Sequence, residues 1–201
     1  MFQRVKPTLF AVFVILPGIA SAGMITDEGL EPYEICALCH SLDGNSRMSK
    51  FPKLAGQPAA YIEKQISDFL AGRRDNDGGQ MVAIVTAELA PENIPIVAEW
   101  FATQAPPPPV EAGDVTAGET AFADLGCKTC HDEADPATET PHLTSQHQAY
   151  LVKQMEDFRD GRRGNDADGA MQAAMQNVSD ADIEAIATYL SATPRGFDGN
   201  S

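Results

Sequence analysis

The pattern of apolar and polar residues predicts amphipathic helices in two similar parts of the chain. Between residues 61 and 71, large apolar side chains recur three or four positions apart, which places them on one face of a helix. A matching stripe occurs later in the chain, so the two stripes consist of Ile62, Ile66, Phe69 and Leu70, and of Leu151, Met155 and Phe158. Each helix is expected to end at a glycine, Gly72 or Gly161, because glycine readily adopts the left-handed conformation that follows many helices.

A further helix is predicted at the end of each part, beginning near Pro91 and near Ser179. Ser179 precedes Asp180 and Asp182, as an N-cap residue precedes acidic residues in a first helical turn. The apolar faces of these helices consist of Ile94, Val97, Ala98 and Phe101, and of Ile183, Ile186, Ala187 and Leu190. No alternating Val/Ile/Thr-rich segment with hairpin turns follows residue 22, so the sequence predicts an all-α fold.

An internal repeat divides the chain into two domains. Residues 51–77 align without a gap to residues 140–166, and about half of the aligned positions are identical. Between the copies, Pro106–Pro109 favours an extended, semi-rigid spacer, although a surface linker with no mechanical role would have the same composition. We therefore predict an N-terminal domain over residues 23–104, a Pro-rich linker over 105–113, a C-terminal domain over 114–195 and a tail over 196–201.

Residues 1–22 have the features of a secretory signal peptide. Arg4 and Lys6 form a basic start, a short apolar stretch follows, and Ala20-Ser21-Ala22 has the small residues of a signal-peptidase site. The alternative is a retained membrane anchor, but the apolar stretch is shorter than the about 20 residues that span a bilayer. We therefore expect an exported, periplasmic protein.

Two short motifs indicate the chemistry. Cys36-Ala37-Leu38-Cys39-His40 recurs as Cys127-Lys128-Thr129-Cys130-His131, and a CxxCH motif is typical of covalent haem c attachment. Cysteines three residues apart lie about one helical turn from each other, so both thiols can bond one haem edge while the next histidine ligates the iron. Two disulfides or two zinc sites are the alternatives, but neither explains the histidine after each cysteine pair. The sequence thus predicts two haem c groups.

A second axial ligand on each iron is expected to be a methionine, whose soft sulfur stabilises the reduced iron. In the first domain, Met81 follows a polar loop and precedes the last helix, whereas Met24 and Met48 are poorly placed. In the second domain, Met171 occupies the corresponding place one residue out of register, and Met175 is the alternative.

Six other residues of the repeat also have candidate roles. His142 and His147 could ligate the second iron, but they match Lys53 and Pro58, so we expect them to be surface residues. A repeated arginine pair, Arg73-Arg74 and Arg162-Arg163, either holds haem propionates or carries solvated charge at a helix end.

The net charge limits the class of partner. The charge of −15 becomes −17 when Arg4 and Lys6 leave with the signal peptide, because residues 1–22 contain no acid. Such a surface repels nucleic acid and steers partner proteins with basic docking surfaces, although acidity that serves only solubility is the alternative.

These features together resemble a di-haem cytochrome c of the c4 type, a class I cytochrome c. The resemblance extends over residues 24–193 and includes Asp43-Gly44-Asn45-Ser46, the segment 51–57, and the Tyr-x-x-Lys-Gln-x-x-Asp-Phe pattern in both halves. It implies two cytochrome c domains related by a pseudo-twofold axis, with ligand pairs His40 with Met81 and His131 with Met171. There are two departures. Asp132–Pro136 replaces the glycine-rich stretch of the family, and Thr144-Ser145 stands where the first copy has Ala55-Gly56.

The resemblance implies a periplasmic electron carrier that feeds a terminal oxidase and has no catalytic residue. The alternative is the electron-accepting haem subunit of a sulfide or thiosulfate dehydrogenase, so a membrane-bound oxidase or a dehydrogenase is the expected partner. A gas sensor or peroxidase would need an open iron site, and a thiolate-ligated enzyme would need a fifth cysteine, which the chain lacks.

Overall fold

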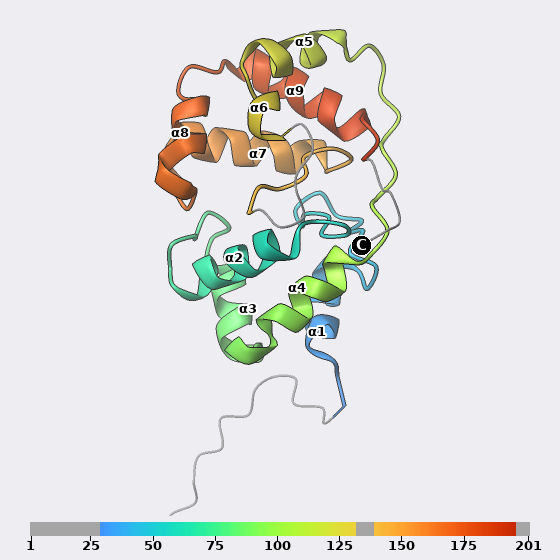
Figure 1. The fold of residues 1–201 in the computed structure, drawn as a ribbon, viewed down its shortest axis with the longest axis vertical. Helices are drawn as coiled ribbons and strands as arrows, with labels where there is room; N and C mark the ends of the chain where they lie inside the picture. The colour runs from blue at the N-terminus through green and yellow to red at the C-terminus, as the bar shows by residue number, and fades with distance from the viewer. Residues whose placement is uncertain (1–28, 132–138, 196–201) are drawn as a thin grey trace, which may run out of the picture.

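The computed structural model describes residues 29–131 and 139–195, and every regular element in these residues is a helix (Figure 1). The first half contains α1 (Pro32–His40), α2 (Ala59–Leu70), α3 (Gln80–Glu88), the 3₁₀ turn η1 (Pro91–Asn93) and α4 (Ile94–Ala102). The second half contains α5 (Thr116–Asp124), α6 (Lys128–His131), α7 (Gln148–Arg159), η2 (Ala167–Gly169), α8 (Ala170–Met175) and α9 (Asp180–Ala192). The predicted all-α class is confirmed. The expected signal peptide, the tail and Asp132–Pro136 lie outside the described residues.

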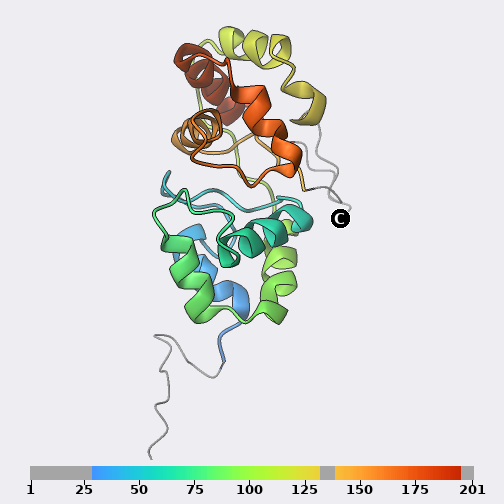
Figure 2. The same ribbon diagram turned by 90° about the vertical axis from the view of Figure 1, so that its left-hand side faces the viewer.

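The two halves are stacked, with α2 of the first half facing α7 of the second (Figures 1 and 2). The Pro-rich segment connects them along one side, and its Val110 N–H donates a hydrogen bond to the Ser191 carbonyl at 3.0 Å. Gly72 and Gly161 follow α2 and α7 with φ of 67° and 71°, as predicted for residues that end a helix.

Each half has its own apolar core, formed largely by the predicted stripes. In the first half, α2 packs on α4, and the predicted face of α4 is fully buried together with Ile62, Ile66 and Phe69 of α2. In the second half, α9 packs on α5 and α7, and its predicted face is likewise buried. Ser179 caps α9 by accepting the N–H of Asp182 at 3.1 Å.

The segments that lead into the two CxxCH motifs differ. In the first half one uninterrupted helix, α1, carries the whole motif. In the second half α5 ends at Asp124, a turn through Gly126 follows, and the short α6 begins within the motif. The second half has more residues between Phe122 and Cys127 than the first half has between the equivalent Tyr33 and Cys36. These extra residues account for the break.

Among the described residues, no single helix is long and apolar enough to cross a membrane. Only α3 and η1–α4 taken together, bent by 102°, reach the necessary length and apolar composition.

A close helix crossing in the second half depends on Gly118 of α5. A Cβ atom at this position would lie 2.0 Å from the carbonyl oxygen of Ala185 in α9. Backbone atoms cannot move aside cheaply, so Gly118→Ala is expected to lower the free energy of unfolding by about 3 kcal/mol. Urea denaturation followed by circular dichroism measures this change. Gly113→Ala is the control, since its Cβ would meet nothing within 4 Å, and equal stabilities of the two variants would contradict the prediction.

Candidate haem sites

The first candidate site lies on α1, where the helix brings Cys36 and Cys39 to one side one turn apart and ends at His40. The His40 side chain is buried, and its Nδ1 lies 2.9 Å from the carbonyl oxygen of Pro52. A carbonyl only accepts hydrogen bonds, so Nδ1 carries the proton and Nε2 keeps its lone pair. A second-shell hydrogen bond of this kind orients an imidazole for metal ligation.

The second half reaches the same arrangement from a different local structure. Cys127 directly precedes α6, which contains Cys130 and ends at His131. The Nδ1 atom of His131 lies 3.2 Å from the carbonyl oxygen of Pro141, the residue that corresponds to Pro52. Both histidines therefore present Nε2 as the available ligand atom.

The histidine and the first cysteine of each motif are at least partly buried. Burial lowers the pKa of His40 and of His131 against the opposing effect of their carbonyl partners, so both imidazoles are neutral and able to ligate iron. Burial, together with the neighbouring Cys39, raises the pKa of the Cys36 thiol to about 11. These environments fit the apolar edge of a porphyrin.

The alternatives to haem receive no support from the described residues. No disulfide joins any of the four cysteines. Within residues 29–131 and 139–195, no group of three or more His, Cys, Asp or Glu side chains is placed to hold a metal ion.

The two candidate methionine ligands are held by equivalent aspartates. The Met81 N–H donates to Asp77 and the Met171 N–H donates to Asp166, each at 2.6 Å. Asp77 and Asp166 are equivalent in the repeat, so the extra residue of the second half lies between Asp166 and Met171. Met171 therefore occupies the place of Met81 despite the one-residue shift.

The remaining methionines have other surroundings. Met175 is only 4% exposed and packs into the core with Phe158, Val178 and Ile183. Met155 packs against the core of the second half, whereas Met48 is exposed. Both Met81 and Met171 are only half-buried at the rim of their cores, at the start of α3 and α8. These contacts support Met171 rather than Met175 as the ligand.

A buried polar network joins the two halves, and two arginines form its centre. Arg74 donates to Gln65 of its own half at 2.8 Å and to Gln154 of the other half at 3.1 Å. Arg163 donates to Gln154 at 2.7 Å and crosses to Gln65 at 2.9 Å. The network has the same pseudo-twofold symmetry as the fold, and each amide oxygen accepts from both guanidinium groups.

The neighbouring side chains repeat this symmetry. Asn165 donates to Asp68 at 2.7 Å, and Lys64 reaches the Asn165 carbonyl at 2.6 Å. In the mirror arrangement Asn76 donates to Asp157, and Lys153 reaches the Asn76 carbonyl. Burial would raise the pKa of Asp68, but hydrogen bonds from Lys64, Asn165 and Arg73 outweigh it and lower the pKa.

This network was missed in the sequence. We expected the repeated arginines to hold propionates or to be solvated, but Arg74 and Arg163 are 6% and 7% exposed and cross between the halves. The repeat could have indicated this contact, because two similar halves related by a twofold axis contact each other through equivalent residues. Most polar positions that are identical in both copies take part in this contact, among them Lys64, Gln65, Asp68, Arg74 and Asn76, with Lys153, Gln154, Asp157, Arg163 and Asn165.

A second part of the contact corrects our expectation for the two histidines. His147 lies 2.9 Å from the Ser46 carbonyl oxygen, and the backbone of His142 exchanges two hydrogen bonds with the Gln57 amide. Both histidines are half-buried rather than free on the surface, because the packing of the two halves against each other partly covers them.

Cations accumulate at this contact although the protein is acidic. Six of them donate hydrogen bonds from one half to the other: Lys53, Lys64, Arg74, Lys153, Arg163 and Arg195. Lys53 and Arg195 reach only backbone carbonyl groups, and the Arg195 Nε atom is buried without a partner in the described residues. This surplus fits a cofactor that brings its own carboxylates, as haem does through its propionates.

The contact is expected to weaken in mild acid because of His142. Burial first, and then the positive charge of Arg195, lower its pKa to about 4. In the unfolded chain a histidine titrates near pH ~6.5, so the folded state binds fewer protons between these values. Stability is therefore full above pH ~6.5 and declines as the pH falls towards about 4. His142→Asn should flatten this decline in urea unfolding at a series of pH values, whereas an unchanged slope would contradict the role of His142.

Comparisons with known proteins agree with this geometry. A family model described as cytochrome c matches residues 115–194. The chain is 35% identical over 187 residues to cytochrome c4 of Pseudomonas aeruginosa, covering 87% of this chain and 92% of the relative. It is 31% identical over 179 residues to a thiosulfate dehydrogenase electron acceptor of Stutzerimonas stutzeri, covering 82% of each. The crystal structure of reduced cytochrome c4 from Pseudomonas stutzeri superimposes with a TM-score of 0.70 at 32% identity, covering 79% of this chain and 93% of that one.

Proposed function

Because the chain belongs to the cytochrome c4 family, a family of electron-transport proteins with covalently bound haem c, we propose that it carries electrons between redox proteins in the periplasm, towards a terminal oxidase. The single observation that carries the proposal is that each half contains a carbonyl-oriented histidine and a methionine whose N–H is held by an equivalent aspartate. When bound, haem c supplies a one-electron ferric/ferrous couple.

In this proposal each residue of the chain has a limited role. The thiols of Cys36 and Cys39, and of Cys127 and Cys130, attach the two porphyrins. His40 with Met81, and His131 with Met171, would ligate the two irons. With two protein ligands on each iron, the chain would exchange electrons without binding a substrate at either iron.

The acidic surface supports fast association with partners of opposite charge. The chain has a net charge near −17 without residues 1–22, and many of its Arg and Lys side chains lie in the contact between the halves. Long-range attraction therefore steers basic docking surfaces towards the molecule. Such steering weakens as salt shortens the Debye length from about 30 Å at 0.01 M to about 8 Å at 0.15 M.

One experiment tests the carrier function. The purified, reduced holoprotein is mixed with membranes of the source cell, and its oxidation is followed spectroscopically with and without cyanide. A carrier should release two electrons per chain, show no spectral change with carbon monoxide, and be oxidised in a cyanide-sensitive reaction that slows with salt. Carbon monoxide binding at both irons, or no oxidation by the membranes, would contradict the proposal.

A second function is favoured by the similarity to a thiosulfate dehydrogenase electron acceptor. In that case the protein would receive electrons from a thiosulfate-oxidising catalytic subunit and would co-purify with it. Thiosulfate-dependent reduction by the soluble cell fraction, lost when that subunit is removed, would select this function over the oxidase pathway.

A further inference from the structure

The two halves contact each other through one kind of surface that the chain contains twice. Beside the arginine network, the Lys53 backbone exchanges two hydrogen bonds with the Gln146 amide, at 2.8 and 2.9 Å. The His142 backbone exchanges two with the Gln57 amide, at 3.0 and 2.8 Å. Lys53 is equivalent to His142 in the repeat, and Gln57 to Gln146. This is the isologous arrangement of a symmetric dimer interface, so its bonds can form equally between halves of different chains.

Each half can leave the other without opening its own apolar core. The described core clusters belong to one half each: the first lies within residues 33–101, and the other two lie within residues 121–190. The network between the halves consists instead of hydrogen bonds between polar side chains and backbone groups. Separation of the halves therefore exposes groups that water can hydrogen-bond.

The Pro-rich segment is the covalent connection between the halves, and it is held at its two ends. The Ala105 carbonyl accepts a hydrogen bond from the Asn45 amide at 3.5 Å, and the Val110 N–H donates to the Ser191 carbonyl at 3.0 Å. Between these ends, the four residues Pro106–Pro109 span about 12 Å in an extended form. Proline has no N–H group, so these residues donate no backbone hydrogen bond that would be lost if the segment moved.

Two contacts break the symmetry and determine which halves pair. The His147 Nε2 atom lies 2.9 Å from the Ser46 carbonyl oxygen, whereas the equivalent of His147 in the first half is Pro58, which has no polar side-chain atom. Arg195, which follows α9, donates to the Ala55 carbonyl at 2.7 Å. Both contacts require a first half and a second half. Pairing between chains therefore joins unlike halves, and two chains satisfy each other reciprocally.

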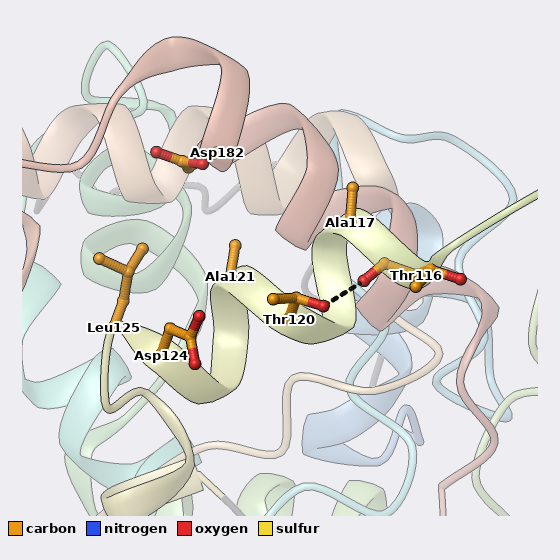
Figure 3. Close-up of a pocket in the computed structure, with 7 residues that line it drawn as sticks. All are labelled: Thr116, Ala117, Thr120, Ala121, Asp124, Leu125 and Asp182. Atoms are coloured by element: carbon orange, nitrogen blue, oxygen red, sulfur yellow. Dashed lines mark hydrogen bonds between the residues drawn. The ribbon is translucent and has the colours of Figure 1, made fainter.

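The outer surface of the molecule disfavours association with a second copy. The chain has a net charge near −17 without residues 1–22. The hollow between α5 and α9 is bordered by the carboxylates of Asp124 and Asp182 (Figure 3), and it lies on the side of the second half that is turned away from the first half (Figures 1 and 2). Two copies that met at such acidic surfaces would repel each other. The contact between the halves, where the cations are concentrated, does not have this disadvantage.

We propose that this surface binds a second copy of the chain by exchange of halves, so that the first half of each copy pairs with the second half of the other. The dimer contains the monomer's contact twice, and the two forms differ only in the path of the Pro-rich segments and in translational freedom. Halves joined by a short linker have an effective concentration on the order of mM. The monomer therefore prevails in dilute solution, and the dimer forms when the linker cannot bridge the halves of one chain.

Shortening the linker tests the exchange in the purified holoprotein. Deletion of Pro106–Pro109 joins Ala105 directly to Val110, so one chain can no longer keep both ends of the segment in place. Size-exclusion chromatography with light scattering at about 10 µM should give the mass of one chain for the unaltered protein and of two chains for the deletion variant. The control replaces Pro106–Pro109 by Gly-Ser-Gly-Ser, which keeps the length and should stay monomeric. A monomeric deletion variant, or equal dimer fractions in the deletion and control variants, would overturn the proposal.

A second pair of variants tests whether the dimer uses the same network. Gln65→Ala with Gln154→Ala removes the oxygens that the two arginines share, so in the deletion variant this change should return the mass to that of one chain. Arg73→Gln in the deletion variant is the control and should leave the dimer intact, because the Arg73 side chain is 60% exposed. Unchanged haem absorbance in each variant shows that both halves are folded. A dimer that persists without the two glutamines would place the association elsewhere and overturn the proposal.

Discussion

Met171→Ala should remove the methionine ligand of the second haem, whereas Met175→Ala should leave that haem intact and weaken the fold. Met171 is half-buried and its N–H is held by Asp166 at 2.6 Å, as that of Met81 is held by Asp77. Loss of the thioether should abolish half of the long-wavelength ferric charge-transfer band and open one iron to carbon monoxide. It should also lower one midpoint potential by on the order of 100 mV or more, within the roughly 0.8 V range that axial ligands control.

Met175 provides a matched control because it lies on the same short helix. It is 4% exposed in a cluster with Phe158 and Ile183, so truncation to alanine leaves a cavity and should cost about 2–5 kcal/mol of unfolding free energy. Absorbance, carbon monoxide titration and redox potentiometry on both variants, with urea denaturation, separate the two roles. Loss of the band in the Met175 variant and its retention in the Met171 variant would reverse the assignment.

Much of the fold could be predicted because its helices bury apolar stripes against their own core. The faces of α4 and α9 were predicted residue by residue, and all eight side chains are buried. Helices α3 and α8 were not predicted. They are short, and each exposes or half-buries most of its side chains, so neither shows a clear stripe of period 3.6. The break between α5 and α6 was also missed, since it results from a local insertion rather than from hydrophobic periodicity.

The haem motifs could be recognised in the sequence because their residues are close together in the chain. The contact between the halves could not be predicted in this way. Gln65, Asp68 and Arg74 are polar, and periodicity assigns polar residues of an amphipathic helix to solvent. Their burial is caused by the other copy of the same residues, which lies almost 90 positions away in the chain. A hydrophobicity pattern cannot report such a contact, whereas polar identity between the two repeats can.

Replacing Gln65 and Gln154 together with alanine is expected to separate the halves while each keeps its haem. The Gln65 Oε1 atom accepts hydrogen bonds from Arg74, Arg163 and Asn165 at 2.8, 2.9 and 3.0 Å. Gln154 Oε1 accepts the three equivalent bonds. Without these oxygens, two buried guanidinium groups of like charge lose their shared acceptors, and the cost is about 3–5 kcal/mol.

The measurement combines small-angle scattering, urea unfolding and rapid-mixing redox kinetics. The double variant should be more extended, should unfold in two steps, and should exchange electrons between its haems more slowly, with unchanged axial-ligand spectra. Arg73→Gln is the control, because its side chain is 60% exposed and its ion pair with Asp68 is worth only about 1 kcal/mol or less.

A glutamate at position 65 distinguishes charge from shape as the basis of this contact. Gln65→Glu keeps the acceptor atom and places a carboxylate between two guanidinium groups, so the halves should stay together at least as firmly as in the unaltered protein. If the glutamate variant separates as the alanine variant does, the precise amide geometry holds the halves together. If neither variant separates, the apolar and backbone contacts suffice, and the polar network contributes only to the choice of orientation.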